Sequence, residues 1–360
     1  MKAALLWEQK TPLKIQDIEV NEPRRGEVLV KTVASGVCHS DLHMIEGLWP
    51  SQLPLLLGHE AAGIVEQVGE GVSYVTPGDH VVISFRAFCG RCDNCVTGRP
   101  HLCNDAVNAD PGAAEGRYEV DGVRVTQFTS VGSFAEKMLV SENAVLKVRE
   151  DAPLDKLCLV GCSVMTGVGA AVNTAQVRPG AKVAVIGAGG VGLNIIQGAR
   201  LCGASQIIAI DLLDNKLELA KQFGATHVVN ASKDEPVGAV QALAGGALDF
   251  AFESIGRPQS ATDAFNMVPF GGTVVVVGMM PLASEVVLPG MGFLFEKRVL
   301  GCLYGSARYR YDMPRLIDLY MDGKLMIDEL VSRTAGLEGV NDAFDAMKKG
   351  EVARTVLSLN

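Results

Sequence analysis

Four cysteines lie close together in one short stretch of the chain. Cys89, Cys92 and Cys95 are each separated by two residues, and Cys103 follows after seven more. Four thiolates on one loop form the ligand set of a tetrahedral structural zinc site, which leaves no coordination position for a substrate. In a reducing cytoplasm, clustered cysteines indicate metal ligands rather than disulfides. The stretch therefore predicts a zinc ion that stabilises this loop and takes no part in catalysis.

A second group of possible metal ligands is dispersed along the chain. It comprises Cys38, His59 and Cys162, the first of them within the segment Cys-His-Ser-Asp-Leu-His. Two thiolates and one imidazole leave a fourth position open, which is the arrangement of a catalytic zinc. Spacing alone does not assemble this group, because a single histidine or cysteine is more often structural.

A glycine-rich turn predicts a dinucleotide site. Gly187, Gly189, Gly190, Val191 and Gly192 follow an apolar run at 182–186 and precede an expected helix at 193–202. Glycines at this spacing allow a tight turn, close approach of a pyrophosphate and close packing of the helix on the strand. The next apolar run ends in Asp211, whose carboxylate would hold ribose hydroxyls and repel a 2′-phosphate, so NAD is favoured over NADP. The alternative is that Asp211 only caps the following helix.

The elements that must position these residues fall into three zones. Residues 1–163 contain short β-type runs separated by Gly and Pro turns, which indicates a mainly-β domain. Residues 164–303 alternate apolar strands with helical stretches, which predicts a doubly wound parallel sheet of the α/β class. The expected strands there are 182–186, 206–210, 227–230, 248–252, 273–277 and 298–303. Residues 304–360 should add helices at 314–322 and 339–348 and a strand at 355–359 that returns to the first domain.

Composition limits the classes of protein to consider. The chain has 360 residues, of which 48% are hydrophobic, with 40 glycines and a formal net charge of −9. These values fit a compact α/β protein and argue against disorder or a disulfide scaffold. A negative chain without a run of five basic residues gives no reason to expect nucleic acid or an anionic membrane as a partner. We expect a cytoplasmic protein that does not enter the membrane.

Together these motifs resemble the zinc-dependent medium-chain alcohol dehydrogenases. The segment beginning at Cys38, the sequence Gly-His-Glu-x-x-Gly around His59, the cysteine loop, Cys162, the glycine motif and the terminal Arg-Thr-Val-Leu from Arg354 occur in the family's order over nearly the whole chain. The resemblance implies a GroES-like catalytic domain (1–163), a Rossmann NAD-binding domain (164–303) and a C-terminal segment (304–360) that rejoins the catalytic domain. It also implies NAD and two zinc ions per chain, one catalytic and one structural.

The resemblance assigns roles around the catalytic zinc. It implies that Cys38, His59 and Cys162 hold the metal. Asp41 would then accept the free ring N–H of His59, and Glu60 would lie behind the metal and adjust its coordination.

The resemblance also implies a route for the alcohol proton and a set of cofactor contacts. Zinc would lower the pKa of a bound alcohol, Ser40 would take the proton, and His43 would deliver it to solvent through the nicotinamide ribose. The alternative for His43 is an ordinary solvated histidine. Besides the glycine motif and Asp211, the residues placed against the cofactor are His39, where many relatives have arginine, and Thr166, Lys216, Val277 and Arg354.

The substrate pocket would have large apolar walls. The resemblance places Trp49, Phe85, Phe128 and Met279 there, which suits a medium-chain or aromatic primary alcohol and its aldehyde. The alternative is that some of these residues are ordinary core. The long segment between the fourth loop cysteine and Cys162 resembles the dimeric animal enzymes, so a homodimer is favoured over a tetramer.

Three alternatives to an alcohol dehydrogenase that exchanges its NAD remain. One is a nicotinoprotein alcohol dehydrogenase, a branch whose members keep NAD bound and regenerate it in place. Another is a thiol-dependent formaldehyde dehydrogenase, which needs basic residues near the pocket, and Arg86 and Arg117 are the nearby candidates. The third is an inactive NAD-binding relative, which typically lacks zinc ligands or proton relay.

Overall fold

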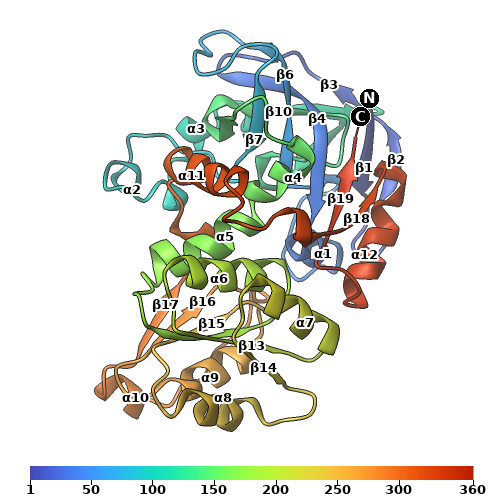
Figure 1. Cartoon of the computed structure of the whole chain (residues 1–360). Coiled ribbons are helices and arrows are strands. Elements are labelled where there is room, and N and C mark those ends of the chain that lie inside the picture. Colours follow the sequence, from blue (N-terminus) through green and yellow to red (C-terminus); the bar gives the residue numbers. More distant parts are fainter. Residues whose placement is uncertain (360) are drawn as a thin grey trace. The chain divides into compact units, whose positions relative to one another are not determined.

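The computed structural model describes residues 1–359, and the chain divides into two compact units (Figure 1). The first contains Met1–Cys162 together with the chain from Arg308 onward, and the second contains Ser163–Ala307. The borders expected from sequence were 163 and 303, against 162 and 307 in the structure.

The first unit is built mainly from two sheets. Within the described residues, one sheet has the strand order β2-β1-β5-β9-β8-β3 and the other the order β11-β7-β6-β4-β19-β18, with β10 also paired to β4. The strands are β1 (Lys2–Leu6), β2 (Lys14–Asp17), β3 (Glu19–Val20), β4 (Glu27–Val37), β5 (Leu55–Leu56), β6 (Glu60–Val68), β7 (His80–Ile83), β8 (Tyr118–Val120), β9 (Val123–Gln127), β10 (Lys137–Ser141), β11 (Val145–Lys147), β18 (Val331–Ala335) and β19 (Arg354–Ser358). Its helices are α1 (His39–Ile45), α2 (Asp93–Val96), α3 (Ala106–Ala109), α4 (Leu154–Leu157), α11 (Tyr309–Met321) and α12 (Val340–Lys348).

The end of the chain lies in the same sheet as its beginning. Strand β19 (red) runs antiparallel beside β4 (blue), with Thr355 opposite Val37 (Figure 1). Helix α12 packs its buried side chains, Phe344 among them, into a core cluster that also contains Leu42 of α1 and Leu57. This burial supports the segment that carries Cys38, because α1 begins directly after that residue.

The second unit confirms the expected parallel sheet. Its strand order is β14-β13-β12-β15-β16-β17, and every neighbouring pair is parallel. A core cluster packs α8 and α9 against one face, and α6 contacts the sheet through β12 and β13. The elements are α5 (Ser163–Gly169), β12 (Lys182–Ile186), α6 (Gly190–Leu201), β13 (Gln206–Asp211), α7 (Asp214–Phe223), β14 (His227–Asn230), α8 (Pro236–Ala244), β15 (Phe250–Glu253), α9 (Pro258–Met267), β16 (Thr273–Val276), α10 (Met291–Leu294) and β17 (Arg298–Gly301).

One helix begins earlier than expected. Proline is favoured in the first turn of a helix, which places the expected start at Pro314. Helix α11 instead begins at Tyr309, where the Asp312 carboxylate reaches back to accept the backbone N–H of the preceding residue, Arg308, at 2.7 Å.

Candidate active site

Strand pairing brings the dispersed ligands together. Strands β4 and β6 are antiparallel with Gly36 opposite Glu60, so Cys38, just after β4, and His59, just before β6, lie at the same end of the sheet. A Cβ at Gly36 would lie 2.4 Å from a Glu60 carboxylate oxygen, so only glycine fits beside that side chain. Cys162 follows the 3₁₀ turn Cys158–Gly161, which packs on β6.

The resulting group has the composition of a catalytic metal site. The ligand atoms of Cys38, His59, Glu60 and Cys162 all lie within 4.8 Å of one another, and all four residues are buried. Two sulfurs and one imidazole nitrogen suit zinc, and the carboxylate adds a fourth potential ligand from the same cluster. Because contact with Cys162 and the charge of Arg354 outweigh burial, the pKa of Cys38 lies well below its usual range. The chain therefore already favours a thiolate at this site.

Asp41 orients the histidine of this group. Its carboxylate, which is fully buried, accepts the Gly58 N–H at 2.9 Å and the Cys38 N–H at 3.2 Å, and it lies 3.2 Å from His59 Nδ1. A carboxylate at Nδ1 holds that nitrogen protonated and leaves Nε2 for a metal. Gly58 has φ +92°, and a Cβ there would meet the Ser133 hydroxyl, so glycine is needed to present this N–H.

A buried arginine lies behind the ligands. Arg354 Nη2 is 3.5 Å from Glu60 Oε1 and 3.8 Å from Cys38 Sγ. Burial raises the pKa of Glu60 to about 7, although the charge of Arg354 opposes that rise. Motif matching placed Arg354 at cofactor phosphates, and the structure shows it in contact with Glu60 and Cys38. Its role toward phosphates stays a prediction.

The expected proton relay starts beside the metal ligands. Ser40 Oγ lies 3.8 Å from Cys38 Sγ. His43 lies on the same helix and is partly buried, and burial lowers its pKa. A lowered pKa keeps the imidazole neutral near pH 7, the form that can accept a proton. His39 is exposed at the start of α1.

Two of the expected pocket residues contact the histidine ligand. The rings of Phe128 and Phe85 approach His59 edge-on, with centroids 5.3 Å and 5.7 Å away. Both side chains are partly buried, and Trp49 packs on the same core cluster as Phe128. The aromatic rings therefore belong to the surroundings of this candidate metal site.

The four-cysteine loop has sulfur spacing that suits zinc. A tetrahedral ion with Zn–S bonds of about 2.3 Å holds its sulfurs about 3.8 Å apart. The Sγ atoms of Cys89 and Cys95 are 3.9 Å apart, and Cys92 lies 3.5 Å from Cys95 and 3.9 Å from Cys103. Backbone N–H groups directed at the sulfur lower the pKa of Cys92 to about 6. The loop thus presents one preformed thiolate, that of Cys92.

The glycine motif in the second unit is tied to Asp211. The Asp211 carboxylate accepts the Ala188 N–H at 2.8 Å with one oxygen and the Leu212 N–H at 2.8 Å with the other. Gly187 has φ +96°, and a Cβ at Gly192 would lie 1.7 Å from the Gly187 carbonyl oxygen, so both positions require glycine. Asp211 therefore connects the end of β13 to the glycine turn. Its role is not limited to capping the following helix.

Sequence reasoning missed a second acidic residue in this unit. Glu253 ends β15, is fully buried, and accepts hydrogen bonds from the N–H groups of Ile255 and Gly256 and from the Ser260 hydroxyl. The sequence did contain a signal for Glu253, because it is an acidic residue at the end of an apolar strand, as Asp211 is. The remaining motif-matched residues of this unit, whose roles stay predictions, are Thr166, Gly189, Gly190, Val191, Lys216, Val277 and Met279.

Neither basic candidate for a thiol adduct is free. Arg117 is 1% exposed and forms ion pairs with Glu27 and Asp110. Arg86 donates to the carbonyl oxygens of His101 and Cys103. Both guanidinium groups therefore hold the chain's own structure together.

Comparison with known proteins agrees with this geometry. Residues 24–150 match the alcohol dehydrogenase GroES-like domain, and residues 190–322 match the zinc-binding dehydrogenase domain. The chain is 42% identical over 364 residues to the NDMA-dependent alcohol dehydrogenase of Amycolatopsis methanolica, covering 99% of this chain and 98% of that protein. It is 38% identical over 373 residues to the S-(hydroxymethyl)glutathione dehydrogenase of Paracoccus denitrificans, covering 99% of each.

A solved structure extends the comparison to the whole fold. The benzyl alcohol dehydrogenase of Acinetobacter calcoaceticus superposes with a TM-score of 0.92 at 35% identity, covering 100% of this chain and 99% of that one. The protein thus belongs to the zinc-dependent medium-chain alcohol dehydrogenase family, with a GroES-like domain and a Rossmann-type domain, as its motifs predicted. Within residues 1–359 no single helix is long and apolar enough to cross a membrane, while one bent pair, 154–161 with 163–174, meets that test by length and composition.

Proposed function

We propose that this chain oxidises a medium-chain or aromatic primary alcohol to its aldehyde, with hydride transfer to NAD, and catalyses the reverse reduction. The observation that carries the proposal is the buried group of Cys38, His59 and Cys162, with Phe85 and Phe128 against its histidine. Apolar aromatic surroundings favour an uncharged, apolar substrate. The first unit serves as the catalytic domain and the second as the cofactor domain.

The chain's own residues support each part of this reaction. Zinc, when bound at this site, supplies a Lewis acid that makes the alcohol hydroxyl more acidic. Asp41 holds the His59 ring through Nδ1, so that Nε2 would be the atom available to bind the metal. Ser40 Oγ accepts the hydroxyl proton, and the neutral imidazole of His43 carries it toward solvent. Phe85 and Phe128 exclude water from the reacting carbon.

The test is the absorbance of reduced nicotinamide when purified protein meets NAD and ethanol, hexanol, benzyl alcohol or a secondary alcohol. Sustained growth of the signal with primary alcohols supports the proposal and ranks the substrates. A signal limited to about one equivalent per chain would identify bound, non-exchanging NAD, the second candidate, which the similarity to an NDMA-dependent enzyme favours. Turnover only with a formaldehyde–thiol adduct would contradict the alcohol proposal.

NAD is proposed as the cofactor, and Asp211 is proposed to select it. We expect Asp211→Asn to weaken NAD binding about 10- to 100-fold, since a hydrogen bond to a charged group contributes about 1.5–3 kcal/mol. NADP binding should stay the same or improve, because a negative charge that repels the 2′-phosphate is removed. Calorimetric titration with both nucleotides measures the two affinities.

A nearby carboxylate provides the matched control for this variant. Asp214→Asn should leave both affinities unchanged, because Asp214 is exposed and paired with Lys233 and Asn230. Equal weakening of NAD binding in both variants would contradict the role of Asp211.

We also propose a homodimer formed through the edge of the parallel sheet. Among the described residues β17 pairs only with β16, and all four of its residues are exposed. Apolar side chains surround this edge, which is typical of a surface covered by another chain. The exposed apolar residues are Phe270, Met291, Phe293, Leu294, Phe295, Val299, Leu300 and Leu303. A second copy would cover this edge by antiparallel pairing of β17 with its symmetry mate.

A charge at this edge should separate the subunits. We expect Leu300→Asp to convert a dimer into a monomer, because the carboxylate would be desolvated between paired strands. Light scattering coupled to size exclusion measures the mass. Leu243→Asp, at an equally exposed leucine of α8, should stay dimeric. A monomeric wild type, or a dimeric Leu300→Asp, would refute this interface.

The reducing cytoplasm is the proposed location. All nine cysteines lie within the described part of the chain, and all are free thiols. This state suits a compartment in which thiolates remain available as metal ligands.

A further inference from the structure

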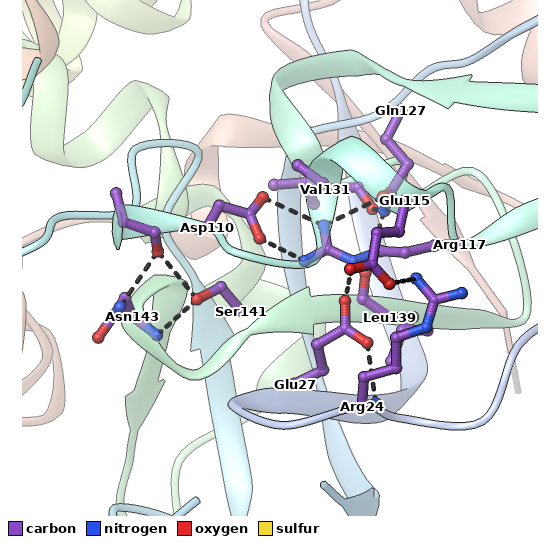
Figure 2. A network of polar contacts seen from close by, with 12 residues as sticks. Arg24, Glu27, Asp110, Glu115, Arg117, Gln127, Val131, Leu139, Ser141 and Asn143 are labelled. Carbon is purple, nitrogen blue, oxygen red and sulfur yellow. Dashed lines mark hydrogen bonds and ion pairs between the residues drawn. The ribbon is translucent and has the colours of Figure 1, made fainter. Parts of the chain in front are cut away.

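A buried ionic cluster lies in the first unit (Figure 2). Arg117 Nε donates to Glu27 Oε1 at 2.8 Å, and Nη1 donates to Asp110 Oδ2 at 3.1 Å. Nη2 also contacts Asp110, so the arginine and this carboxylate form a two-point pair. Glu27 and Arg117 are each 1% exposed. Breaking such a pair leaves an uncompensated buried charge, so the guanidinium has little freedom to move.

The cluster fixes the orientation of one amide side chain. Arg117 Nη1 also donates to Gln127 Oε1 at 3.2 Å. A guanidinium only donates, so the amide oxygen of Gln127 must face it, and the NH₂ group must point away. That NH₂ group donates to the carbonyl oxygens of Val131 at 2.8 Å and Leu139 at 3.1 Å. Figure 2 shows Gln127 and Arg117 directed toward one another within this network.

Gln127 thereby closes a strained turn. The 3₁₀ turn Phe128–Ser130 follows it, and Thr129 and Ser130 have φ of +52° and +59°. Residues other than glycine adopt this conformation at a cost of about 1–3 kcal/mol each, and only where the surroundings impose it. The turn is held by the Val131 N–H to the Phe128 carbonyl at 3.0 Å and by Gln127 to the Val131 carbonyl. Loss of the Gln127 side-chain amide therefore removes one of these two hydrogen bonds.

The residue at the start of the turn is the ring against the metal ligand. Phe128 lies edge-on to His59, and its ring offers no polar group that could anchor it. Its position therefore depends on packing and on the backbone of the turn. We propose that Gln127, aligned by Arg117, is a positioning residue that holds Phe128 against His59 and so sets which alcohols fit. This inference rests on the proposed function, in which Phe128 lines the alcohol pocket.

The experiment is a double-mutant cycle on substrate selectivity. The measured quantity is the ratio of kcat/KM for benzyl alcohol to that for ethanol, in Gln127→Ala, Phe128→Ala and the double variant of the full chain. We expect each single variant to change the ratio about 10-fold or more, the size of effect that one apolar pocket contact carries. The double variant should match Phe128→Ala, because Gln127 acts through that ring. Changes that multiply in the double variant would overturn the inference.

A neighbouring arginine provides the matched control. Arg124 lies on the same strand β9 and donates to the carbonyl oxygens of Ala114 and Ala113 rather than to the amide of Gln127. Arg124→Ala should leave the ratio unchanged, whereas an equal change would show a nonspecific effect of the loop and overturn the inference. If Gln127→Ala does not fold, Gln127→Glu is the second variant. It keeps the acceptor for Arg117 but removes the donor to Val131, so the same change in ratio is expected.

A second readout does not depend on turnover. The chain has six histidines, so the ring signals of His59 can be followed by nuclear magnetic resonance in the zinc-loaded protein. An aromatic ring whose centroid lies 5.3 Å from that of His59 shifts these signals, and Gln127→Ala should move them in the direction seen in Phe128→Ala. Unchanged His59 signals in Gln127→Ala would overturn the positioning role.

The two readouts separate the inference from the proposed function. If wild type oxidises no alcohol, the proposed activity fails, and the His59 signals alone decide whether Gln127 positions the ring. If Phe128→Ala leaves the selectivity ratio unchanged, the pocket assignment fails and the inference about alcohol choice fails with it. If Phe128→Ala changes the ratio and Gln127→Ala does not, only the inference fails.

Discussion

Cys38→Ser should abolish alcohol oxidation while NAD still binds. The Cys38 sulfur is one of the two thiols in the buried metal group, and its contact with Cys162 and the charge of Arg354 hold its pKa low, so it can bind zinc as a thiolate. Loss of Lewis acidity removes several kcal/mol of transition-state stabilisation, and each 1.36 kcal/mol is tenfold, so we expect kcat/KM to fall about 1000-fold or more. The glycine motif lies in the other unit, so NAD affinity should be unchanged.

Three measurements on one preparation check this expectation. They are the rate of alcohol oxidation, the zinc content per chain and the NAD affinity, and the zinc content should fall by about one equivalent. Cys158→Ser is the matched control, because that thiol is equally buried and lies outside the ligand group. Full zinc content with undiminished oxidation in Cys38→Ser would show that the catalytic site lies elsewhere.

Cys92→Ser should cost one zinc ion and much of the stability of the cysteine loop. Helix α2 has four residues, none of them buried, so apolar packing contributes little to this loop. The metal must therefore supply its folding energy, and we expect the free energy of unfolding to fall by more than about 4 kcal/mol, the range associated with loss of a metal. Phe88 next to the loop contacts Tyr309 of α11, so the loss should extend beyond the loop.

Thermal unfolding and zinc analysis test this second expectation. Cys202→Ser, at a half-buried cysteine outside both ligand groups, should keep two zinc ions and the wild-type melting temperature. Cys92→Ser with unchanged zinc content and melting temperature would refute a structural zinc site. Protease cleavage within 89–103 offers a local readout, because a loop without metal should be cut first.

The parallel sheet was predictable because its signal is local. Strands buried on both faces require nearly continuous apolar runs, and the run at 182–186 matches β12 residue for residue. The boundary of α11 was not predictable in this way. Its start depends on the Asp312 carboxylate reaching the Arg308 N–H, which the preference of proline for a first turn concealed.

Arg117 shows how long-range contacts change the interpretation of a residue. Its sequence position made it a candidate for binding a substrate carboxylate. Its actual partners are Glu27, at the start of β4 and far earlier in the chain, and Asp110, in the segment just before Arg117. Only folding reveals that both carboxylates are within hydrogen-bond distance, and that the guanidinium is therefore not available to a ligand.

The amino-acid sequence alone determined the four-cysteine loop, the glycine turn with Asp211, and the class of the sheet, because each depends on residues close together in the chain.

Tertiary structure decided how the residues of the candidate active site come together. The register of β4 on β6 brings Cys38 beside His59, and the turn after Cys158 adds Cys162. The contact of Arg354 with Glu60 and the contact of Phe128 with His59 likewise depend on bringing distant segments together. The sequence separation of residues in such contacts follows no fixed pattern, because sheet register and burial decide which residues meet.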